Sequence, residues 1–347
     1  MRALQIVGDH ELKVQDVPVP ELAPDEVLVR VAGAGLCHSD LHVWHMDGWP
    51  LTPMTLGHET AGWVEQVGAE VAGFQQGDAV LVYLIWACGV CRACVEGRDN
   101  ACITTGGRFG MPPCPGLGPD GGMAEYIKVA SRYLEPLGSL DPTTAGPLAD
   151  AGLTSYHAIE GARHRLAPGS TAVVIGVGGL GHVGLQILRA TTGARVIAVD
   201  AAEAKLEVAR QHGADETLLS DATAADTILE MTDGYGADAV FDFAGAQPTV
   251  DLATQVIAPD GALRFVGLGG GSFEFSTDAT VFNLPWGVDV RRSYAGTRKD
   301  QRRVIELAAA GRIQIETEQY SLEEGPKAFE DLEHGRIRGR AILVPSH

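Results

Sequence analysis

The chain has 347 residues, a length that suggests about two domains and is sufficient to bury a large core. Apolar residues make up 45% of the sequence and charged residues 20%, a composition that argues against disorder and against a coiled coil. The formal net charge of −19 should repel phosphate backbones and anionic lipid surfaces, so we expect neither nucleic acid nor a membrane as a partner.

The N-terminal sequence MRALQIVGDHELKVQD contains no long apolar run, so it predicts no signal peptide. The most apolar stretch, residues 172–188, has six Gly or His among its seventeen residues and is too short and interrupted to span a bilayer. We therefore expect a cytoplasmic protein. In such a protein, four cysteines within fifteen residues favour metal binding over disulfide bonds.

The predicted secondary structure changes near residue 152. The first part is β-rich, and its strands are expected at Ala3–Val7, Glu26–Val31, Trp63–Val67 and Ala79–Val82. In the second part, strands alternate with helical patterns and are expected at Ala172–Ile175, Val196–Val199, Glu216–Leu219, Ala239–Asp242 and Ala262–Val266. This βαβ alternation predicts a parallel sheet covered by helices on both faces. It stops after Arg291, and a helix is expected at Lys299–Ala310.

A glycine-rich turn follows the first of these parallel strands and opens a helical pattern; it reads Gly176-Val-Gly178-Gly179-Leu180-Gly181. This strand–turn–helix context is typical of dinucleotide binding, and an ordinary glycine turn is the weaker alternative. Free N–H groups at the start of the helix would hold a pyrophosphate despite the negative charge of the chain. The next strand ends at Asp200, whose carboxylate would bond both ribose hydroxyls and repel a 2′-phosphate, so NAD is favoured over NADP.

Four cysteines form the spacing Cys88-x2-Cys91-x2-Cys94-x7-Cys102. Four thiolates complete a tetrahedral zinc site with no open position, so we expect a structural zinc that stabilises the lobe of residues 87–102. An iron–sulfur cluster is the alternative, but its usual run has three residues and a proline at the last cysteine, whereas seven residues intervene here. Cys114 stands apart and is interpreted as a buried or loop thiol.

A second metal site would need an open position for substrate, and Cys37 and His58 are the candidates. Each alone is more often a packed core residue. His58, however, lies in the pattern G-H-E-x2-G-x5-G-x2-V at residues 57–71. With the four-cysteine lobe and the glycine-rich turn, this pattern resembles the zinc-dependent medium-chain alcohol dehydrogenases, and among them the bacterial secondary-alcohol dehydrogenases. The resemblance covers essentially the whole chain.

The resemblance implies a catalytic zinc held by Cys37 and His58. The third ligand in the family is Cys or Asp, and Asp150 stands at that place. Glu59 matches the acid that can approach the zinc, and Asp40 matches the carboxylate that orients the ligand histidine. An oxygen ligand in place of a second thiolate should leave the zinc at least as strong a Lewis acid.

The resemblance also implies a proton relay and a set of cofactor contacts. Ser39 and His42 match the relay, which would carry the alcohol proton through the Ser39 hydroxyl and the nicotinamide ribose to His42 at the surface. The alternative for His42 is a solvated surface histidine. The matched cofactor contacts are Thr154 beside the nicotinamide ring, Lys205 near the adenosine ribose, Val266 and Leu268 against the carboxamide, and His38 and Arg338 at the pyrophosphate, with Arg340 as the alternative to Arg338.

The fold class implied is α/β: a GroES-like β-rich catalytic domain, residues 1–151 and 295–347, and a Rossmann domain with a doubly wound parallel sheet, residues 152–294. The implied activity is the reversible NAD-linked oxidation of alcohols to ketones or aldehydes, with two zinc ions per chain. A homo-oligomer, tetramer or dimer, is also implied.

Three alternatives to this function differ in recognisable features. A polyol or primary-alcohol dehydrogenase could use the same scaffold, although polyol enzymes commonly lack a complete cysteine lobe. The zinc-free quinone reductase branch lacks Cys37 and the lobe, so it is rejected. A non-catalytic NAD-binding structural protein would not be expected to retain the relay and ligand residues.

The stretches that would line the substrate pocket predict an apolar secondary alcohol. They are residues 84–86, 44–51 and 282–286, and they include Trp44, Trp49, Trp86, Phe282 and Trp286 but no cluster of charged groups for a sugar or an acid. Each tryptophan could equally belong to the core. Ser39 is smaller than the threonine of many primary-alcohol enzymes and would leave room for a second carbon substituent.

Overall fold

The computed structural model describes residues 1–278, 280–281 and 283–346 and divides into two compact units. Unit 1 contains residues 1–153, 295–311 and the described residues from 315 onward, and unit 2 contains the described residues of 154–294 and residues 312–314. Across the described part of the chain, every helix is too short or too polar to cross a membrane.

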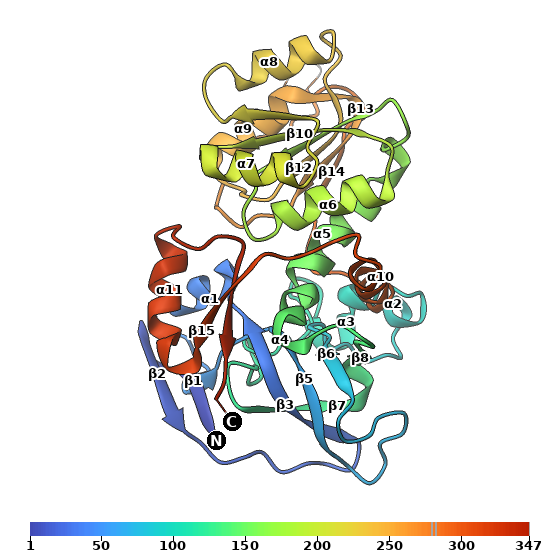
Figure 1. Cartoon of the computed structure of the whole chain (residues 1–347). Coiled ribbons are helices and arrows are strands. Elements are labelled where there is room, and N and C mark those ends of the chain that lie inside the picture. Colours follow the sequence, from blue (N-terminus) through green and yellow to red (C-terminus); the bar gives the residue numbers. More distant parts are fainter. Residues whose placement is uncertain (279, 282, 347) are drawn as a thin grey trace. The chain divides into compact units, whose positions relative to one another are not determined.

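Unit 1 is rich in β-strands, as predicted for the first 150 residues, and all but one of its recorded strand pairings are antiparallel (Figure 1). A seven-stranded sheet has the order β15 (Thr317–Ser321), β16 (Arg340–Val344), β3 (Glu26–Gly35), β5 (Glu59–Val67), β6 (Ala79–Val82) and β8 (Leu134–Pro136), and β7 (Tyr126–Ala130) also pairs with β3. A three-stranded sheet has the order β2 (Glu11–Asp16), β1 (Arg2–Gly8) and β4 (Met54–Thr55). The four predicted strands are confirmed as parts of β1, β3, β5 and β6.

The helices of unit 1 are short and lie mostly between strands. They are α1 (His38–Trp44), α2 (Arg92–Val95), α3 (Ile103–Gly106), α4 (Pro142–Ala145), α10 (Arg298–Ala309), α11 (Gly325–Glu333) and the 3₁₀ turns η1 (Asp99–Ala101), η2 (Ser131–Tyr133), η3 (Gly146–Ala149) and η5 (Leu322–Glu324). The predicted helix at residues 299–310 is confirmed as α10. It begins one residue earlier because Thr297 and Asp300 form a capping box.

Unit 2 contains a six-stranded sheet in which every recorded pairing is parallel (Figure 1). The strand order is β11 (Glu216–Leu219), β10 (Arg195–Asp200), β9 (Thr171–Ile175), β12 (Ala237–Asp242), β13 (Ile257–Phe265) and β14 (Asp289–Arg292). This is the order of a Rossmann fold, in which ligands bind at the carboxyl ends of the strands where the order reverses. Here the reversal lies between β9 and β12.

The central parallel strands β9, β10 and β12 are nearly continuous apolar runs because both faces of the sheet are buried there, whereas β11 and β14 at the edges are partly exposed. Val173, Ile197, Val240 and Leu263 have no exposed surface and belong to one core cluster. The helices of this unit are α5 (Ala151–Glu160), which starts at the unit boundary, α6 (Gly181–Thr191), α7 (Glu203–Gln211), α8 (Ala224–Met231), α9 (Gln247–Val256) and the 3₁₀ turn η4 (Arg163–Arg165). All five strands predicted for this part of the chain are confirmed.

Candidate active site

Three side chains from distant parts of unit 1 converge beside the seven-stranded sheet. Cys37 is the N-cap of α1, His58 directly precedes β5, and Asp150 directly precedes α5. The Asp150 Oδ2 atom lies 3.3 Å from Cys37 Sγ and 3.7 Å from His58 Nε2. One ligand atom from each residue falls within 4.8 Å of the other two. Ligand atoms about 2.0–2.3 Å from one zinc ion require separations of this order, so the group fits a zinc ion.

Asp40 orients the histidine of this group. Its Oδ1 atom lies 3.3 Å from His58 Nδ1, and its Oδ2 atom accepts the backbone N–H of Cys37 at 2.9 Å. Burial acts to lower the pKa of His58, but the charge of Asp40 and the contact with Asp150 raise this pKa well above 6.5. A metal ion bound at Nε2 would displace a proton, so metal affinity should depend on pH.

A buried arginine holds the remaining acid of the site. Arg340 and Glu59 are 2% and 0% exposed, and they form a bidentate pair with Nε–Oε2 at 2.8 Å and Nη2–Oε1 at 2.5 Å. Arg340 Nη2 also lies 3.3 Å from Asp150 Oδ2, and the N–H of Ala151 donates to Glu59 Oε1 at 3.0 Å. Burial alone would lower the pKa of Arg340, whereas the charges of Glu59 and Cys37 raise it well above the ordinary value of an arginine. Glu59 therefore lies against the arginine and outside the three-residue metal group.

The structure distinguishes the two C-terminal arginines that the sequence left open. Arg338 is exposed, and its Nε donates to Glu316 at 2.9 Å. Arg340 is committed to Glu59 and Asp150 within unit 1. Sequence reasoning gave Arg340 no role at the metal site, and only its basic character beside an apolar strand could have suggested one.

The helix that follows Cys37 carries the other residues expected near the metal. Ser39 Oγ lies 3.7 Å from Cys37 Sγ, and Ser39 is partly buried. His38 and His42 are exposed on the same helix. Ser39 and His42 are three residues apart, a spacing that places two side chains on one face of a helix.

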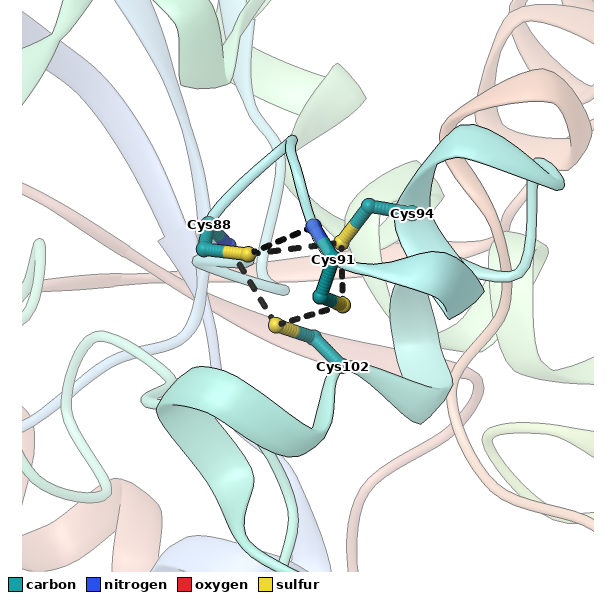
Figure 2. Close-up of side chains that lie close together, drawn as sticks. All are labelled: Cys88, Cys91, Cys94 and Cys102. Carbon is teal, nitrogen blue, oxygen red and sulfur yellow. Dashed lines mark hydrogen bonds between the residues drawn. The ribbon is translucent and has the colours of Figure 1, made fainter.

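The four cysteines of the lobe point toward one another, as Figure 2 shows. Their sulfur atoms are separated by 3.5 Å between Cys91 and Cys94, 3.8 Å between Cys91 and Cys102, and 3.9 Å between Cys88 and Cys94. Burial acts to raise the pKa of Cys102, but the N–H of Cys88 and the Thr105 hydroxyl lower it to about 5. A thiolate with these donors is a suitable metal ligand, so the donor set fits a zinc ion.

Cys114 lies outside both groups. It is buried, and burial raises the pKa of its thiol to about 12. This placement confirms the interpretation of Cys114 as a buried thiol and makes it an unreactive one.

In unit 2, the glycine-rich turn has the backbone geometry that phosphate binding requires. Gly176 has a φ of +85°, and a Cβ at Gly181 would lie 1.8 Å from the Gly176 carbonyl oxygen, so a side chain is excluded there. A Cβ at Gly178 would meet nothing within 4 Å, which leaves the backbone open to a ligand. Gly179 and Leu180 complete the turn, and Leu180 is the N-cap of α6.

Asp200 lies against this turn at the end of β10. Its Oδ2 accepts the N–H of Val177 at 2.7 Å and its Oδ1 accepts the N–H of Ala202 at 3.0 Å. The other residues expected at the cofactor are Thr154, buried on α5; Lys205, exposed on α7; Val266, buried after β13; and Leu268, 52% exposed. Asp200 and Val266 thus share the carboxyl edge of the sheet with the turn.

The apolar stretches expected at the substrate pocket include tryptophans that contact the protein. Trp86 stacks on Tyr133 with ring centroids 5.4 Å apart, and Trp44 meets the Phe329 ring edge-on at 5.8 Å. Trp286 is 77% exposed, and Phe282 lies outside the described residues. Trp49 also packs against the core of unit 1, so packing accounts for three of these aromatic side chains.

Two family profiles match the sequence. "Alcohol dehydrogenase GroES-like domain" matches residues 23–139, and "Zinc-binding dehydrogenase" matches residues 179–310. The chain is 36% identical to the NAD-dependent alcohol dehydrogenase of Sulfurisphaera tokodaii, over 99% of this chain and 100% of that protein. It is 35% identical to the D-arabinose 1-dehydrogenase (NADP(+)) of Saccharolobus solfataricus, over 96% and 94% of the two chains.

Solved structures show the same fold over the whole length. The alcohol dehydrogenase of the archaeon Aeropyrum pernix has a TM-score of 0.90 and 34% identity, with 99% of this chain and 100% of that chain covered. The acetophenone reductase of Geotrichum candidum, solved in complex with NAD, has a TM-score of 0.85 and 30% identity, with 99% and 96% covered. These findings confirm the predicted combination of a GroES-like and a Rossmann domain.

Proposed function

The chain belongs to the family of zinc-dependent medium-chain alcohol dehydrogenases, and we propose that it is an NAD-linked enzyme that interconverts apolar secondary alcohols and ketones, with one catalytic and one structural zinc ion per chain. The observation that carries this proposal is the convergence of Cys37, His58 and Asp150 in a chain that also has four clustered cysteines. Three ligands leave one position of a tetrahedral ion open to substrate, whereas four close it.

The residues around the open site have different roles in an alcohol oxidation. Zinc bound to the three ligands supplies a Lewis acid that lowers the pKa of a coordinated alcohol. Asp40 keeps His58 oriented with Nε2 toward the ion, and Arg340 offsets the negative charge of Glu59 and Asp150. Glu59, which Arg340 holds, is the acid that could approach the ion when one ligand of the ion is exchanged for another.

The proton of the alcohol needs a path out of the site. The Ser39 hydroxyl, beside Cys37, would accept this proton and pass it toward His42 at the surface, and a bound nicotinamide ribose would supply a further hydroxyl for the transfer. His45 on the following turn pairs with Glu333 at 3.0 Å and takes no part, so it serves as the matched control. We expect His42→Ala to lower kcat near neutral pH, and His45→Ala to leave it unchanged.

The dinucleotide is held in unit 2 by backbone and by one carboxylate. The N–H groups of the glycine-rich turn would bind the pyrophosphate, and the carboxylate of Asp200 would accept hydrogen bonds from the hydroxyls of the adenosine ribose. Each carboxylate oxygen has about two acceptor positions, so the bonds from Val177 and Ala202 leave room for the ribose. Further contacts are proposed as the resemblance implied them, at Thr154, Lys205, Val266, Leu268, His38 and Arg338.

The substrate proposal rests on Ser39 and on the apolar stretches at residues 44–51 and 84–86. The likeness to an acetophenone reductase supports an apolar ketone as the product. A polyol or sugar dehydrogenase is the second candidate, because a relative 35% identical carries the name D-arabinose 1-dehydrogenase (NADP(+)). An apolar pocket discriminates substrates mainly by volume, at about 1–3 kcal/mol per methylene.

The remaining proposals concern the setting of the enzyme. We infer a cytoplasmic homo-oligomer, tetramer or dimer, with a catalytic domain at residues 1–151 and 295–347 and a cofactor domain at residues 152–294. The edge strand β14 and the 77% exposed Trp286 support association of the cofactor domain with another copy, because open strand edges and exposed aromatics favour pairing.

A substrate panel tests the proposal most directly. With NAD, kcat/KM for 2-octanol and 1-phenylethanol should exceed that for ethanol by about tenfold or more. Higher values for sorbitol or D-arabinose, or equal use of NAD and NADP, would favour the second candidate. Metal analysis should find two zinc ions per chain, and finding one, or iron, would contradict the metal assignment.

A further inference from the structure

Asp242, the last residue of β12, is a buried carboxylate that the proposed mechanism does not use. It has no exposed surface, and the described residues include no cation paired with it. Burial raises the pKa of its carboxyl group, although three hydrogen bonds act in the opposite direction. Burying an acid without a paired cation destabilises the folded protein. The hydrogen bonds that the carboxylate makes therefore indicate which part of the structure this acid stabilises.

Both carboxylate oxygens organise the turn that follows β12. Oδ1 accepts the N–H groups of Ala244 at 2.9 Å and Gly245 at 2.8 Å, and Oδ2 accepts the hydroxyl of Thr249 at 3.0 Å. We call residues 242–246 the Asp242 turn. Its conformation requires Gly245, which has a φ of +67° and where a Cβ would lie 2.3 Å from the Gly267 oxygen.

The backbone of Asp242 holds the segment after the neighbouring strand β13. Its carbonyl oxygen accepts the N–H groups of Val266 at 2.8 Å and Gly267 at 3.1 Å. The N–H of Gly269 donates to Ala244 at 3.1 Å, which extends the same connection. Residues 266–268, which we call the wall segment, are thereby fixed to the Asp242 turn. This segment contains both proposed carboxamide contacts.

On its other side the Asp242 turn contacts the glycine-rich turn. The N–H of Phe243 donates to the Ile175 oxygen at 2.9 Å, at the end of β9. The Phe243 ring fills the space beside α6, since a Cβ at Gly184 would lie 2.7 Å from it. A Cβ at Gly176 would lie 3.3 Å from Ala244. The Asp242 turn therefore lies between the proposed pyrophosphate and nicotinamide contacts and touches both.

We propose that Asp242 is a positioning residue that fixes the wall segment relative to the glycine-rich turn, so that bound NAD presents its nicotinamide ring in the geometry that hydride transfer requires. One segment holds the pyrophosphate and the other the carboxamide, so a shift between them displaces the ring. A displacement of about 1 Å can slow a reaction by about a hundredfold. This inference rests on the proposed cofactor roles of the two segments.

The decisive variants separate the hydrogen bonds of Asp242 from its charge. Asp242→Ala removes the acceptor of the buried N–H of Gly245 and the partly buried N–H of Ala244, and we expect it to weaken NADH binding by about tenfold or more. Asp242→Asn keeps Oδ1 as the acceptor, and its amide can donate to the Thr249 oxygen. The Thr249 hydroxyl then donates to the Ala246 oxygen, which lies 2.9 Å away. We expect this variant to bind NADH within about threefold of the wild type.

Asp238 offers a matched control on the same strand. Like the carboxylate of Asp242, that of Asp238 accepts a backbone N–H. The donor here is Thr171, at 2.7 Å, which lies at the amino end of the sheet. We expect Asp238→Ala to lower the melting temperature without changing NADH affinity. If circular dichroism shows Asp242→Ala to be unfolded, Asp242→Ser replaces it with the same expectation.

The measurements are NADH titration by fluorescence and the deuterium isotope effect on kcat/KM with a deuterated alcohol. We expect Asp242→Ala to bind NADH weakly and to show a larger isotope effect, because hydride transfer slows relative to substrate binding and release. Unchanged affinity and isotope effect in folded Asp242→Ala would overturn the inference, and so would an Asp242→Asn variant as impaired as Asp242→Ala. Failure of the wild type to bind NADH would overturn the proposed function as well.

Discussion

Replacement of Arg340 tests the charge arrangement at the open metal site. Arg340→Met fills a similar volume but leaves the fully buried Glu59 without its bidentate partner and removes the 3.3 Å contact with Asp150. Removing one member of a buried ion pair costs about 3–5 kcal/mol, because the other charge stays out of water without compensation. The N–H of Ala151 remains as a donor to Glu59 at 3.0 Å, so we expect a loss of folding free energy near the lower end of this range.

The same pair lends itself to a double-mutant cycle. Glu59→Met alone leaves Arg340 near Asp150, so it should be less costly than Arg340→Met. The double variant removes both charges and should recover most of the loss, since an apolar pair of similar volume often replaces a buried ion pair without penalty. Free energies of unfolding from urea titrations in zinc-saturated buffer give the four corners of the cycle.

Arg338→Met is the control, because Arg338 is exposed and pairs with Glu316 at the surface. It should change the free energy of unfolding by less than about 1 kcal/mol. An Arg340→Met variant as stable as this control would refute the reasoning. So would a double variant less stable than both single ones, because the two buried charges would then not depend on each other.

Three further predictions concern single cysteines and cofactor choice. Cys94→Ser should reduce the zinc content from two ions to one per chain and lower the melting temperature, whereas loss of turnover in a fully folded variant would contradict a structural role. Asp200→Ser combined with Ala201→Arg should raise kcat/KM with NADP relative to NAD, and an unchanged ratio would contradict the proposed ribose contact. Because burial raises the pKa of Cys114 to about 12, its thiol should resist iodoacetamide at pH 8 in the folded protein and react after unfolding; rapid modification of the folded protein, read by mass spectrometry, would contradict this. The folded pKa lies above the unfolded value of 9.0, so the stability that Cys114 contributes should be present below pH 9 and lost as the pH rises toward 12.

Strands with continuous burial were predictable from the sequence. The run Ala79–Val82 forms β6 with the same bounds, and five of the six parallel strands of unit 2 overlap their predicted runs. Apolar runs reveal such strands because burial on both faces leaves few polar side chains in them. The Rossmann architecture followed from the family resemblance, and the order of the strands was not predicted from the runs themselves.

Three edge strands were not predictable in this way, although the edge strand β11 was. β2, β14 and β15 read ELKVQD, DVRR and TEQYS, with mostly polar side chains that are only partly buried. They are strands because a neighbour supplies hydrogen bonds, and that neighbour is distant in sequence. Helix α1 was also missed, since seven residues are too few for periodicity to show.

The two metal groups also differ in how far the sequence predicted them. The cysteine lobe was predictable from spacing because its four ligands lie within fifteen residues. Cys37 and Asp150 are 113 positions apart, and only the resemblance linked them. Arg340 was missed as a member of this site because a buried arginine is identified by its tertiary partners, and the sequence shows Arg338 and Arg340 as equivalents.

The charges around the two metal groups support their different proposed roles. In the lobe, backbone N–H groups of the loop itself donate to Cys88 and Cys102, so local structure stabilises these two thiolates. At the open group, Cys37, which a bound metal ion would deprotonate, and Asp150 lie near two further acids, Asp40 and Glu59, and Arg340 is the cation recorded among the described residues there. A divalent ion offsets most of the remaining charge, while three ligands leave its fourth position available. The open group therefore depends on distant residues of the fold for its charge balance, as expected of a site arranged for exchange of ligands at the ion rather than for stapling a loop.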